Sequence, residues 1–329
     1  MKQCITNVRI IGTGSYLPPN VITNNDIAKK VETTDVWIRK HIGVEERRVV
    51  TTELTSDLAA NAALMAMQAA GIDASAIDLI IVATSTPDRL APSTACIVQD
   101  KIQAYNAVAF DLAAVCSGFL FAYSTAAQFI SNNIYQHILV IGADTFSKIV
   151  DWERRDCVFF GDGAGAVVLA KNEGNNGQLN FRLFSDGRGK FNFTIPGGGC
   201  EHPISEESLT NKHRYFQMDG KAVFNTAIEV LPSAINQVLE DAGQSIDDVA
   251  LLIPHQPNIN ILKETARRLN MPFEKVMVNL QKYANTSGGT IPIILDETIR
   301  AGKIKQGDNI LFAAVGSGWT WGAALMKWI

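Results

Sequence analysis

Two apolar segments of equal length, Ile138-Leu-Val-Ile-Gly142 and Ile310-Leu-Phe-Ala-Ala314, decide the fold of this chain. Each has the length and composition of a buried strand, and each leads through a glycine-rich turn into a last apolar segment, at 161–169 and 316–326. The chain of 329 residues is therefore expected to contain one structural unit twice.

A second pair of segments repeats at the offset that separates position 138 from position 310. A helical pattern of Ala, Leu and Met ends at Gly71, and the apolar strand candidate 78–84 follows it. A second helical pattern ends at Gly243, and the apolar run 250–253 follows at the same distance. Short buried strands that alternate with helices predict an α/β fold.

The repeat also predicts how the chain is divided. We expect two similar halves, 1–172 and 173–329, separated by the turn-forming residues of 171–177. An irregular stretch at 185–211 is expected to be either a lid over a pocket or a surface excursion.

The composition is that of a globular protein. Apolar residues make up 47% of the chain and charged residues 19%, which argues against a disordered or fibrous protein. A net charge of -4 argues against a nucleic-acid-binding protein held by a general basic field. Five scattered cysteines without metal-ligand spacing indicate reduced thiols and no metal site. Because residues 1–10 lack the apolar core of a signal peptide, we expect a cytoplasmic protein.

One cysteine stands between a predicted strand and a predicted helix. Residues 108–112 have the pattern of a buried strand, and a helix is predicted to begin at Cys116. The stretch 107–130 is too often interrupted by polar residues and glycine for a membrane span. Free N–H groups at a helix N-terminus lower the pKa of a thiol, so Cys116 is expected to be a thiolate nucleophile. A buried structural cysteine is the alternative.

His255 and Asn285 are the polar residues best placed to act with Cys116. His255 directly follows the apolar run 250–253, and sites in α/β sheets lie at such strand ends. Asn285 lies in a glycine-rich turn before a helix, near the repeat counterpart of Cys116. Alone, it would be expected to cap that helix. A pseudo-dyad would bring the two helix N-termini together, so the three side chains are predicted to converge on one cavity.

Five motifs follow one another along the chain. They are Asp111-Leu-Ala-Ala-Val-Cys-Ser-Gly-Phe119, Gly161-Asp-Gly-Ala-Gly165, Pro254-His-Gln-Pro-Asn258, Asn285-Thr-Ser287 and Gly318-Trp-Thr-Trp-Gly322. Together they resemble the β-ketoacyl-acyl-carrier-protein synthase III family of the thiolase-like superfamily. The resemblance covers the whole chain, and it implies a five-layered αβαβα fold and a homodimer.

The resemblance further implies a condensing acyltransferase with the triad Cys116, His255 and Asn285. Cys116 would take an acyl group from an acyl-CoA primer, with the backbone N–H groups of Cys116 and Ser317 around the oxyanion. A malonyl group on acyl carrier protein would lose carbon dioxide, and His255 Nε2 and Asn285 Nδ2 would stabilise its enolate. Attack on the acylated Cys116 would give a β-ketoacyl thioester and initiate fatty acid synthesis. No metal or redox cofactor is expected.

Coenzyme A is expected to bind at the mouth of the pocket. The resemblance implies that Trp37 and Arg155 sandwich its adenine and that Asn258 contacts it. Arg154 is an alternative to Arg155, because a one-residue gap blurs the match, and a loop-anchoring surface aromatic is the alternative for Trp37. His41 stands where the family has a phosphate-facing arginine, which predicts weaker binding of coenzyme A.

The acyl pocket differs from that of acetyl-primed relatives. Where they carry phenylalanine, at the far end of the pocket across the dimer, this chain has Ala91. Because the missing ring leaves space, we expect primers longer than acetyl to be accepted.

The carrier-protein face also differs. The resemblance places the basic pair Arg267 and Arg268 on this face, and a solvated helix face is the alternative interpretation. Asn225 and Asn260 replace basic residues of the family, which predicts weaker docking of an acidic carrier protein.

These differences define the alternative functions. A specialised ketosynthase of secondary metabolism, using longer primers, malonyl-CoA or a β-ketoacyl thioester, is the main alternative. A non-catalytic acyl-CoA-binding protein is less favoured because the triad is intact. A degradative thiolase would carry a second catalytic cysteine near its end, and no cysteine follows Cys200.

Overall fold

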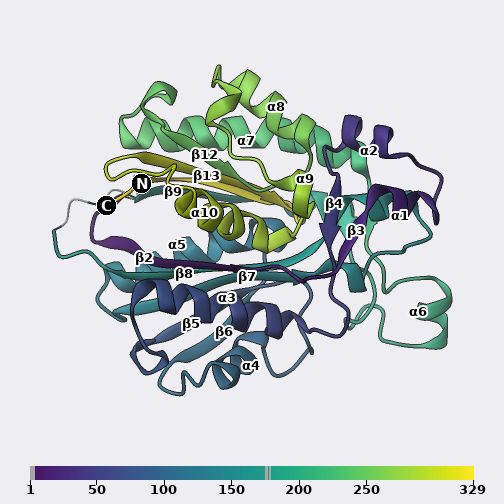
Figure 1. Ribbon diagram of the computed structural model, residues 1–329, viewed down its shortest axis with the longest axis horizontal. Coiled ribbons are helices and arrows are strands. Elements are labelled where there is room, and N and C mark those ends of the chain that lie inside the picture. Colours follow the sequence, from purple (N-terminus) through teal and green to yellow (C-terminus); the bar gives the residue numbers. More distant parts are fainter. Residues whose placement is uncertain (1–3, 175–176, 178) are drawn as a thin grey trace.

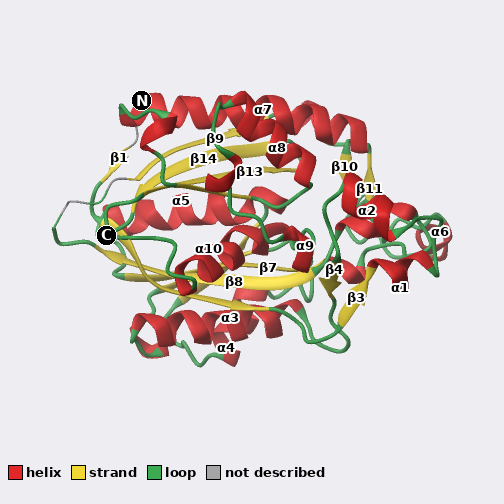
Figure 2. Cartoon of the chain, turned by 45° about the horizontal axis from the view of Figure 1, so that its top comes forward, coloured by secondary structure: helices red, strands yellow, loops and turns green. Residues whose placement is uncertain are grey.

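Two β-sheets and three layers of helices stack alternately from the bottom to the top of the computed structural model (Figure 1), which describes residues 4–174, 177 and 179–329. Figure 2 shows the helices α5 (Gly118–Ser131) and α10 (Thr290–Arg300) in the middle layer, between the sheets. The predicted α/β class with five αβαβα layers is therefore confirmed.

The first sheet has the strand order β2-β8-β7-β5-β6. Its strands are β2 (Val8–Tyr16), β5 (Leu79–Ala83), β6 (Val108–Leu112), β7 (His137–Thr145) and β8 (Asp162–Lys171). β5 runs parallel to both β6 and β7, whereas β8 is antiparallel to β7 and β2. All side chains of β5 are buried, because helices cover both faces of the sheet.

The second sheet has the order β1-β9-β14-β13-β12. Its strands are β1 (Cys4–Ile5), β9 (Leu179–Ser185), β12 (Leu251–Pro254), β13 (Asn309–Gly316) and β14 (Thr320–Lys327). β12 and β13 are parallel, and β14 is antiparallel to β13 and β9. The order β9-β14-β13-β12 repeats the order β2-β8-β7-β5 of the first sheet, whereas β1 pairs on the outer side of β9.

The register shows the repeat residue by residue. Leu79 lies opposite Ile138 in the first sheet, and their counterparts at the repeat offset, Leu251 and Ile310, lie opposite each other in the second. The preceding helices α3 (Thr55–Ala70) and α7 (Gly220–Ala242) both end at a left-handed glycine, with φ of 67° at Gly71 and 66° at Gly243. The predicted repeat is thus confirmed. The helix α7 begins at Gly220, ahead of the helix expected over 230–242.

The outer layers close the two hydrophobic cores. α3 and α4 (Thr94–Lys101) pack on the outer face of the first sheet, and α7 and α8 (Ile259–Arg268) pack on that of the second. Apolar side chains of α5 and α10 fill the space between the sheets. Both central helices therefore begin deep inside the molecule, where the candidate site lies.

Two excursions from the layers gather at one end of the molecule, on the right of Figure 1. The first contains β3 (Val21–Thr23), α1 (Asn24–Ala28), α2 (Asp35–His41) and β4 (Glu46–Arg48), and the short helix α9 (Leu280–Tyr283) contacts β4. The second contains β10 (Phe193–Thr194), α6 (Glu206–Thr210) and β11 (Gln217–Met218). The stretch 185–211, expected to be irregular, thus carries β10 and α6, and β10 pairs with β11.

The expected boundary follows the end of β8 at Lys171, and its residues Asn175 and Asn176 lie outside the described part of the chain. β1, at the start of the chain, pairs with β9 of the second sheet. The division into domains 1–172 and 173–329 stays a prediction. Among the described residues, no helix has both the length and the apolar character needed to cross a membrane.

Candidate active site

Two equivalent 3₁₀ turns meet at the centre of the molecule. The first, η2 (Val115–Ser117), precedes α5, and the second, η8 (Ser287–Gly289), precedes α10 at the equivalent place in the repeat. Their first residues, Val115 and Ser287, both have a positive φ, of 47° and 50°. A left-handed backbone is unfavourable for a β-branched valine, and such strain is concentrated at functional sites.

Cys116 is the middle residue of the first turn, and its side chain is only partly exposed. Its Sγ lies 3.6 Å from the hydroxyl of Ser287 on the second turn. Burial raises the pKa of the Cys116 thiol to about 12, and the negative charge of Asp144 acts in the same direction. The expectation of a lowered pKa is therefore wrong for the free protein: desolvation outweighs the helix N-terminus.

Asp144, at the end of β7, is a buried carboxylate behind the two turns. It accepts hydrogen bonds from the N–H groups of Ser85 and Gly288, at 2.7 and 3.0 Å, and from the Thr86 hydroxyl at 2.9 Å. Burial raises its own pKa. The carboxylate thus ties the loop after β5 to the turn that faces Cys116.

His255 follows β12, as predicted, and is 3% exposed. Its Nδ1 lies 2.7 Å from the hydroxyl of Thr290, which also lies 2.9 Å from the carbonyl oxygen of Ser287. Nε2 is then the ring nitrogen left for the cavity. Burial lowers the pKa of His255 to about 3, so the imidazole is neutral near pH 7.

Asn285 immediately precedes the second turn and is held by both its backbone and its side chain. Its N–H donates to the carbonyl of Phe159, and its carbonyl accepts from Gly161. Its Oδ1 accepts the N–H of Ser287 at 2.8 Å. Because the acceptor is occupied, the Nδ2 group is the part of the amide that can donate to a ligand.

The turn after β13 packs directly on the turn of Cys116. A Cβ atom placed on Gly316 would lie 2.9 Å from the carbonyl oxygen of Ala114 and 3.1 Å from the Cys116 nitrogen. Only glycine permits this approach. Ser317, expected to supply an oxyanion N–H, follows Gly316, and its hydroxyl donates to the carbonyl of Phe193.

A cavity of about 130 Å³ joins these groups. Cys116, His255, Asn285 and Ser317 all line it, together with Asn258 at α8. The structure therefore brings the three residues of the expected triad to one space. Their catalytic roles stay predictions.

Phenylalanines close the cavity on one side. Phe159, Phe160 and Phe193 line it, and Phe146 and Phe216 pack behind them. Ring centroids are 4.5 Å apart for Phe146 and Phe160, and 4.9 Å apart for Phe160 and Phe216.

Ala91, the residue expected to open the acyl pocket, does not line the cavity of the single chain. It is exposed and forms a cis peptide bond with Pro92. The acceptance of longer primers stays a prediction. For Ala91 to act on the primer, a second subunit would have to bring it to the pocket.

Trp37 and Arg155, the two side chains expected to sandwich the adenine of coenzyme A, contact each other. The Arg155 guanidinium carbon lies 4.7 Å from the centroid of the Trp37 ring. Both residues line a cleft whose other residues include Phe159, Met218 and Gly220, which also line the cavity of Cys116. The cleft therefore continues into the cavity.

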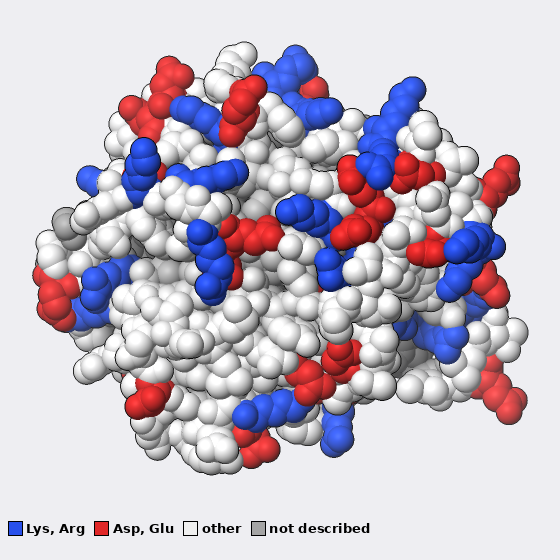
Figure 3. All heavy atoms as spheres, viewed as in Figure 1, with Lys and Arg blue, Asp and Glu red and all other residues white. Residues whose placement is uncertain are grey.

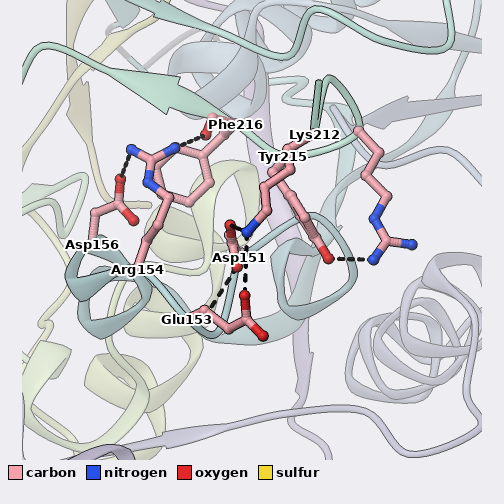
Figure 4. Close-up of polar contacts among 8 residues, drawn as sticks. Asp151, Glu153, Arg154, Asp156, Lys212, Tyr215 and Phe216 are labelled. Carbon is pink, nitrogen blue, oxygen red and sulfur yellow. Dashed lines mark hydrogen bonds and ion pairs between the residues drawn. The ribbon is translucent and has the colours of Figure 1, made fainter. Parts of the chain in front are cut away.

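Arg154, the alternative to Arg155, is engaged elsewhere (Figure 4). It forms an ion pair with Asp156 at 2.5 Å and donates to the carbonyl of Phe216 at 3.4 Å. Lys212, which like Phe216 lies between α6 and β11, forms ion pairs with Asp151 at 3.0 Å and Glu153 at 3.2 Å. The contacts of Phe216 and Lys212 fasten the loop 151–156 to the excursion that contains α6, whereas Arg155 faces Trp37.

Asn258 and Asn260 fasten α8 to the end of α2. Their Nδ2 groups both donate to the carbonyl of His41, at 3.0 and 2.8 Å. The ring of His41 also contacts that of Trp37, with centroids 4.8 Å apart and the planes tilted by 34°. His41 thus supports the Trp37 ring in the place where the family would have a phosphate-facing arginine.

Arg267 and Arg268 do not form a bare basic patch. Both form ion pairs with Glu264, at 2.7 and 2.9 Å, and Arg268 also pairs with Glu229 at 3.0 Å. Basic and acidic side chains are likewise interleaved over the face of the molecule in Figure 3.

Several residues at the site had no predicted role. Ser287 lies in the motif Asn285-Thr-Ser287, but its contact with Cys116 depends on the pairing of η2 and η8. The hydroxyl of Thr290 and the carboxylate of Asp144 carry no sequence signal of their own. Their roles follow only from the three-dimensional contacts of His255 and Gly288.

Comparisons with known proteins match nearly the whole chain in sequence and in fold. The family profiles 3-oxoacyl-[acyl-carrier-protein] synthase III and its C-terminal counterpart match residues 110–187 and 239–328. The β-ketoacyl-[acyl-carrier-protein] synthase III of Clostridium acetobutylicum is 45% identical over 325 residues, covering 98% of this chain and 99% of that protein. That of Caldanaerobacter subterraneus is 46% identical over 322 residues, or 97% of each chain.

Solved structures show the same likeness. The crystal structure of 3-oxoacyl-[acyl-carrier-protein] synthase III from Aquifex aeolicus matches with a TM-score of 0.91 and 43% identity, covering 98% of this chain and 100% of that one. The priming β-ketosynthase from the R1128 polyketide biosynthetic pathway matches with a TM-score of 0.90 and 29% identity, covering 98% and 96%.

Proposed function

Because this chain belongs to the 3-oxoacyl-[acyl-carrier-protein] synthase III family, we propose that it condenses an acyl-CoA primer with malonyl-acyl-carrier protein through an acylated Cys116. The observation that carries the proposal is the cavity that Cys116, His255 and Asn285 share. The product is a β-ketoacyl thioester on the carrier protein, which initiates fatty acid synthesis.

In the first half-reaction, the Cys116 thiol must lose its proton as it attacks the primer. With a pKa of about 12, the thiol is almost entirely protonated near pH 7, so a base is needed. Neutral His255 accepts the proton at Nε2 as the sulfur attacks, while its Nδ1–H donates to Thr290, and the imidazolium that forms is stabilised by the negative charge that develops beside it in the same cavity. The proton then passes to the sulfur of coenzyme A, which leaves as the carbon–sulfur bond to Cys116 forms.

The oxyanion of this step is expected beside the contact between η2 and the turn that follows β13. The close packing of Gly316 on the Cys116 nitrogen supports a role for the N–H groups of Cys116 and Ser317 as its donors. Preorganised N–H donors of this kind lower the barrier to acyl transfer by several kcal/mol, roughly 3 for each donor.

In the second half-reaction, the malonyl thioester loses carbon dioxide and its carbonyl oxygen becomes an enolate. Asn285 donates from Nδ2, since its Oδ1 is held by Ser287. His255 donates from Nε2 in its other neutral tautomer, which carries the ring proton at Nε2 and accepts at Nδ1 from the Thr290 hydroxyl; the two tautomers interconvert by proton exchange with water. The enolate carbon then attacks acyl-Cys116, the sulfur leaves as a thiolate, and this thiolate takes up one proton from water, the proton that decarboxylation of the malonate anion consumes overall.

Trp37 and Arg155 bind the adenine of coenzyme A in this proposal, with Asn258 at the inner end of the cleft. In the free protein the ring and the guanidinium are in contact, 4.7 Å apart, so they must move apart to admit an adenine, which would then stack on both. His41 stands where the resemblance implies a phosphate-facing arginine, and its ring contacts Trp37, which supports weaker binding of the phosphates.

The identity of the malonyl donor has a second candidate, malonyl-CoA, as in a specialised ketosynthase. Glutamates neutralise Arg267 and Arg268, and Asn225 and Asn260 add no charge, so the expected carrier-protein face offers little attraction to an acidic carrier. The likeness to a priming β-ketosynthase of a polyketide pathway supports a specialised ketosynthase as the alternative function.

A homodimer is part of the proposal. β6 is an edge strand whose outer side has no partner among the described residues, and Val108 on it is 50% exposed. Leu90, in the loop that follows β5, is 87% exposed. An unpaired edge beside exposed apolar side chains is a surface that a second copy would cover. Light scattering should give the mass of two chains.

The whole proposal can be tested by mixing the protein with acetyl-, butyryl- and octanoyl-CoA and measuring its intact mass. An added acyl mass on wild-type protein, absent from Cys116→Ala, is expected. Subsequent addition of malonyl-carrier protein or of malonyl-CoA should remove that mass, and the more effective donor identifies the second substrate. Acylation by acetyl-CoA alone, with octanoyl-CoA inert, would refute the expectation based on Ala91.

A further inference from the structure

The two arms of the proposed nucleotide clamp, Trp37 and Arg155, stand on separate short segments. Trp37 is on α2, which has seven residues, and Arg155 begins η4 (Arg155–Phe159), which has five. Neither segment belongs to the stacked layers. The distance between the two arms therefore depends on whatever holds these segments together.

Arg47, on β4, is the group that lies between them. Its side chain is 0% exposed, and among the described residues no carboxylate forms an ion pair with it. Burial lowers its pKa to about 10, so the guanidinium is still charged near pH 7. A buried cation without an anionic partner is costly, and it calls for a functional explanation.

The guanidinium of Arg47 donates to three acceptors from three segments. It donates to the carbonyl of Ile22 at 3.2 Å, to Oδ1 of Asn24 at 3.0 Å and to the carbonyl of Val158 at 3.1 Å. Ile22 belongs to β3, Asn24 begins α1 and Val158 belongs to η4. The guanidinium spreads its donors over two terminal nitrogens in a fixed plane, whereas an ammonium gathers its three donors on one nitrogen and cannot reproduce these directions.

One branch of this network leads to Trp37. Asn24, 1% exposed, donates from Nδ2 to Oδ1 of Asp35 at 2.9 Å and to the carbonyl of Val44 at 2.8 Å. Asp35 is the first residue of α2, two positions before Trp37. The Asn24 side chain therefore fixes the start of the helix that carries the aromatic ring.

The other branch leads to Arg155. Val158 lies one turn after Arg155 in η4, and its carbonyl accepts from Arg47. On the opposite side, Arg154 is fixed by Asp156 and by the carbonyl of Phe216, as Figure 4 shows. Arg155 is thus presented to Trp37 from a segment held at both ends.

We propose that Arg47 is a positioning residue that sets the spacing between Trp37 and Arg155, and so tunes the recognition of the coenzyme A nucleotide. The inference rests on the proposed function, because it assumes that these two residues bind that nucleotide. Arg47 does not touch the ligand. The Cβ atom of Arg47 lies beside Gly161, which helps to hold the Asn285 backbone, and a lysine keeps this atom. Replacement of Arg47 by lysine is therefore expected to act on substrates that carry the nucleotide and to leave the chemistry at Cys116 unchanged.

The test compares Arg47→Lys with Arg48→Lys, its neighbour on β4, which pairs with Glu46. Each variant is assayed for acylation of Cys116 with acyl-CoA and with the matching acyl-pantetheine, which has the thioester and lacks the nucleotide. Loss of one charge-assisted hydrogen bond predicts that Arg47→Lys raises KM for acyl-CoA about tenfold. The value of kcat, both constants for acyl-pantetheine and all constants of Arg48→Lys should stay near wild type.

A double-mutant cycle with Trp37→Ala separates positioning from a general structural effect. Because the clamp is already lost in Trp37→Ala, adding Arg47→Lys should change KM for acyl-CoA less than twofold. Additive effects, or an equal loss with acyl-pantetheine, would overturn the role of Arg47 while the proposed function stands. If wild-type Cys116 is not acylated at all, the proposed function fails, and the inference fails with it.

Discussion

The turns η2 and η8 have the same backbone and carry different chemistry. Both directly precede a central helix, both begin with a residue of positive φ, and they are equivalent in the repeat. The first presents Cys116 where the second has Gly288. The duplicated scaffold brings the two helix N-termini together, and the side chains then assign the nucleophile to one turn.

The same comparison explains the polar groups. Asn285 occupies the position of Ala113, His255 that of Ala83 and Thr290 that of Gly118. In the first half, a Cβ atom on Gly118 would lie 3.1 Å from the Ala83 side chain, so that helix packs tightly against its strand. In the second half, the equivalent contact is the hydrogen bond between Thr290 and His255. An apolar contact in one half is thus a polar contact in the other.

Asn285→Ala should have the largest effect, because it restores the residue of the first half at this position. Loss of the Nδ2 donor to the enolate should slow condensation about a thousandfold. Acylation of Cys116, measured by intact mass, should continue. A similar loss in both half-reactions would show that Asn285 does not act on the enolate.

Gly316→Ala tests the contact between the turn of Cys116 and the end of β13. The new Cβ atom would lie 2.9 Å from the Ala114 carbonyl oxygen and 3.1 Å from the Cys116 nitrogen, so the oxyanion donors must move. Acylation should slow about a hundredfold, and overpacking should lower the free energy of unfolding by about 1–3 kcal/mol.

Gly187→Ala is the control for Gly316→Ala, because a Cβ atom on Gly187 would meet nothing within 4 Å. Single-turnover acylation and chemical denaturation give the two quantities. Wild-type acylation in Gly316→Ala would contradict the placement of the oxyanion at this contact.

Thr290→Val removes the hydroxyl that contacts His255. In the first half of the repeat, the equivalent pair, Gly118 and Ala83, has no such hydroxyl. Because Nδ1 loses this hydrogen-bond partner, the position of the imidazole proton is no longer controlled, and both half-reactions should slow about tenfold. Thr290→Ser keeps the hydroxyl and should retain most of the activity. An unchanged pH–rate profile in Thr290→Val would remove Thr290 from the mechanism.

Asp144→Asn should have the smallest effect and acts on the thiol. The carboxylate raises the pKa of Cys116, so its neutralisation should move the pH of half-maximal alkylation by iodoacetamide to a lower value. Asp162→Asn is the control, because Asp162 is also a buried carboxylate and makes its hydrogen bonds to Ser147 and Val50. Equal shifts in both variants would argue for a general effect on packing.

The fold could be predicted from the sequence because short segments of the chain are enough to recognise its repeat. Glycines at the two helix ends and apolar strands at one offset are short-range signals, as Gly71 and Gly243 illustrate. The convergence of Cys116, His255 and Asn285 followed from the same repeat, and the structure places all three on one cavity.

The electrostatics of the site could not be predicted in this way. The helix N-terminus near Cys116 is a local feature, whereas the burial and the Asp144 charge that raise the thiol pKa come from distant segments. Likewise, nothing around Arg47 in the sequence marks it as buried, because its three acceptors lie on β3, α1 and η4. Such contacts exist only after the chain has folded.

The most direct measurement of the central claim is peptide-level mass spectrometry of the protein after brief exposure to acyl-CoA in the absence of a malonyl donor. One acyl group per chain, on the peptide that contains Cys116, is predicted, and malonyl-carrier protein or malonyl-CoA should discharge it as a β-ketoacyl thioester. An acyl group on another residue, or a stable acyl-Cys116 that no malonyl thioester discharges, would contradict the account.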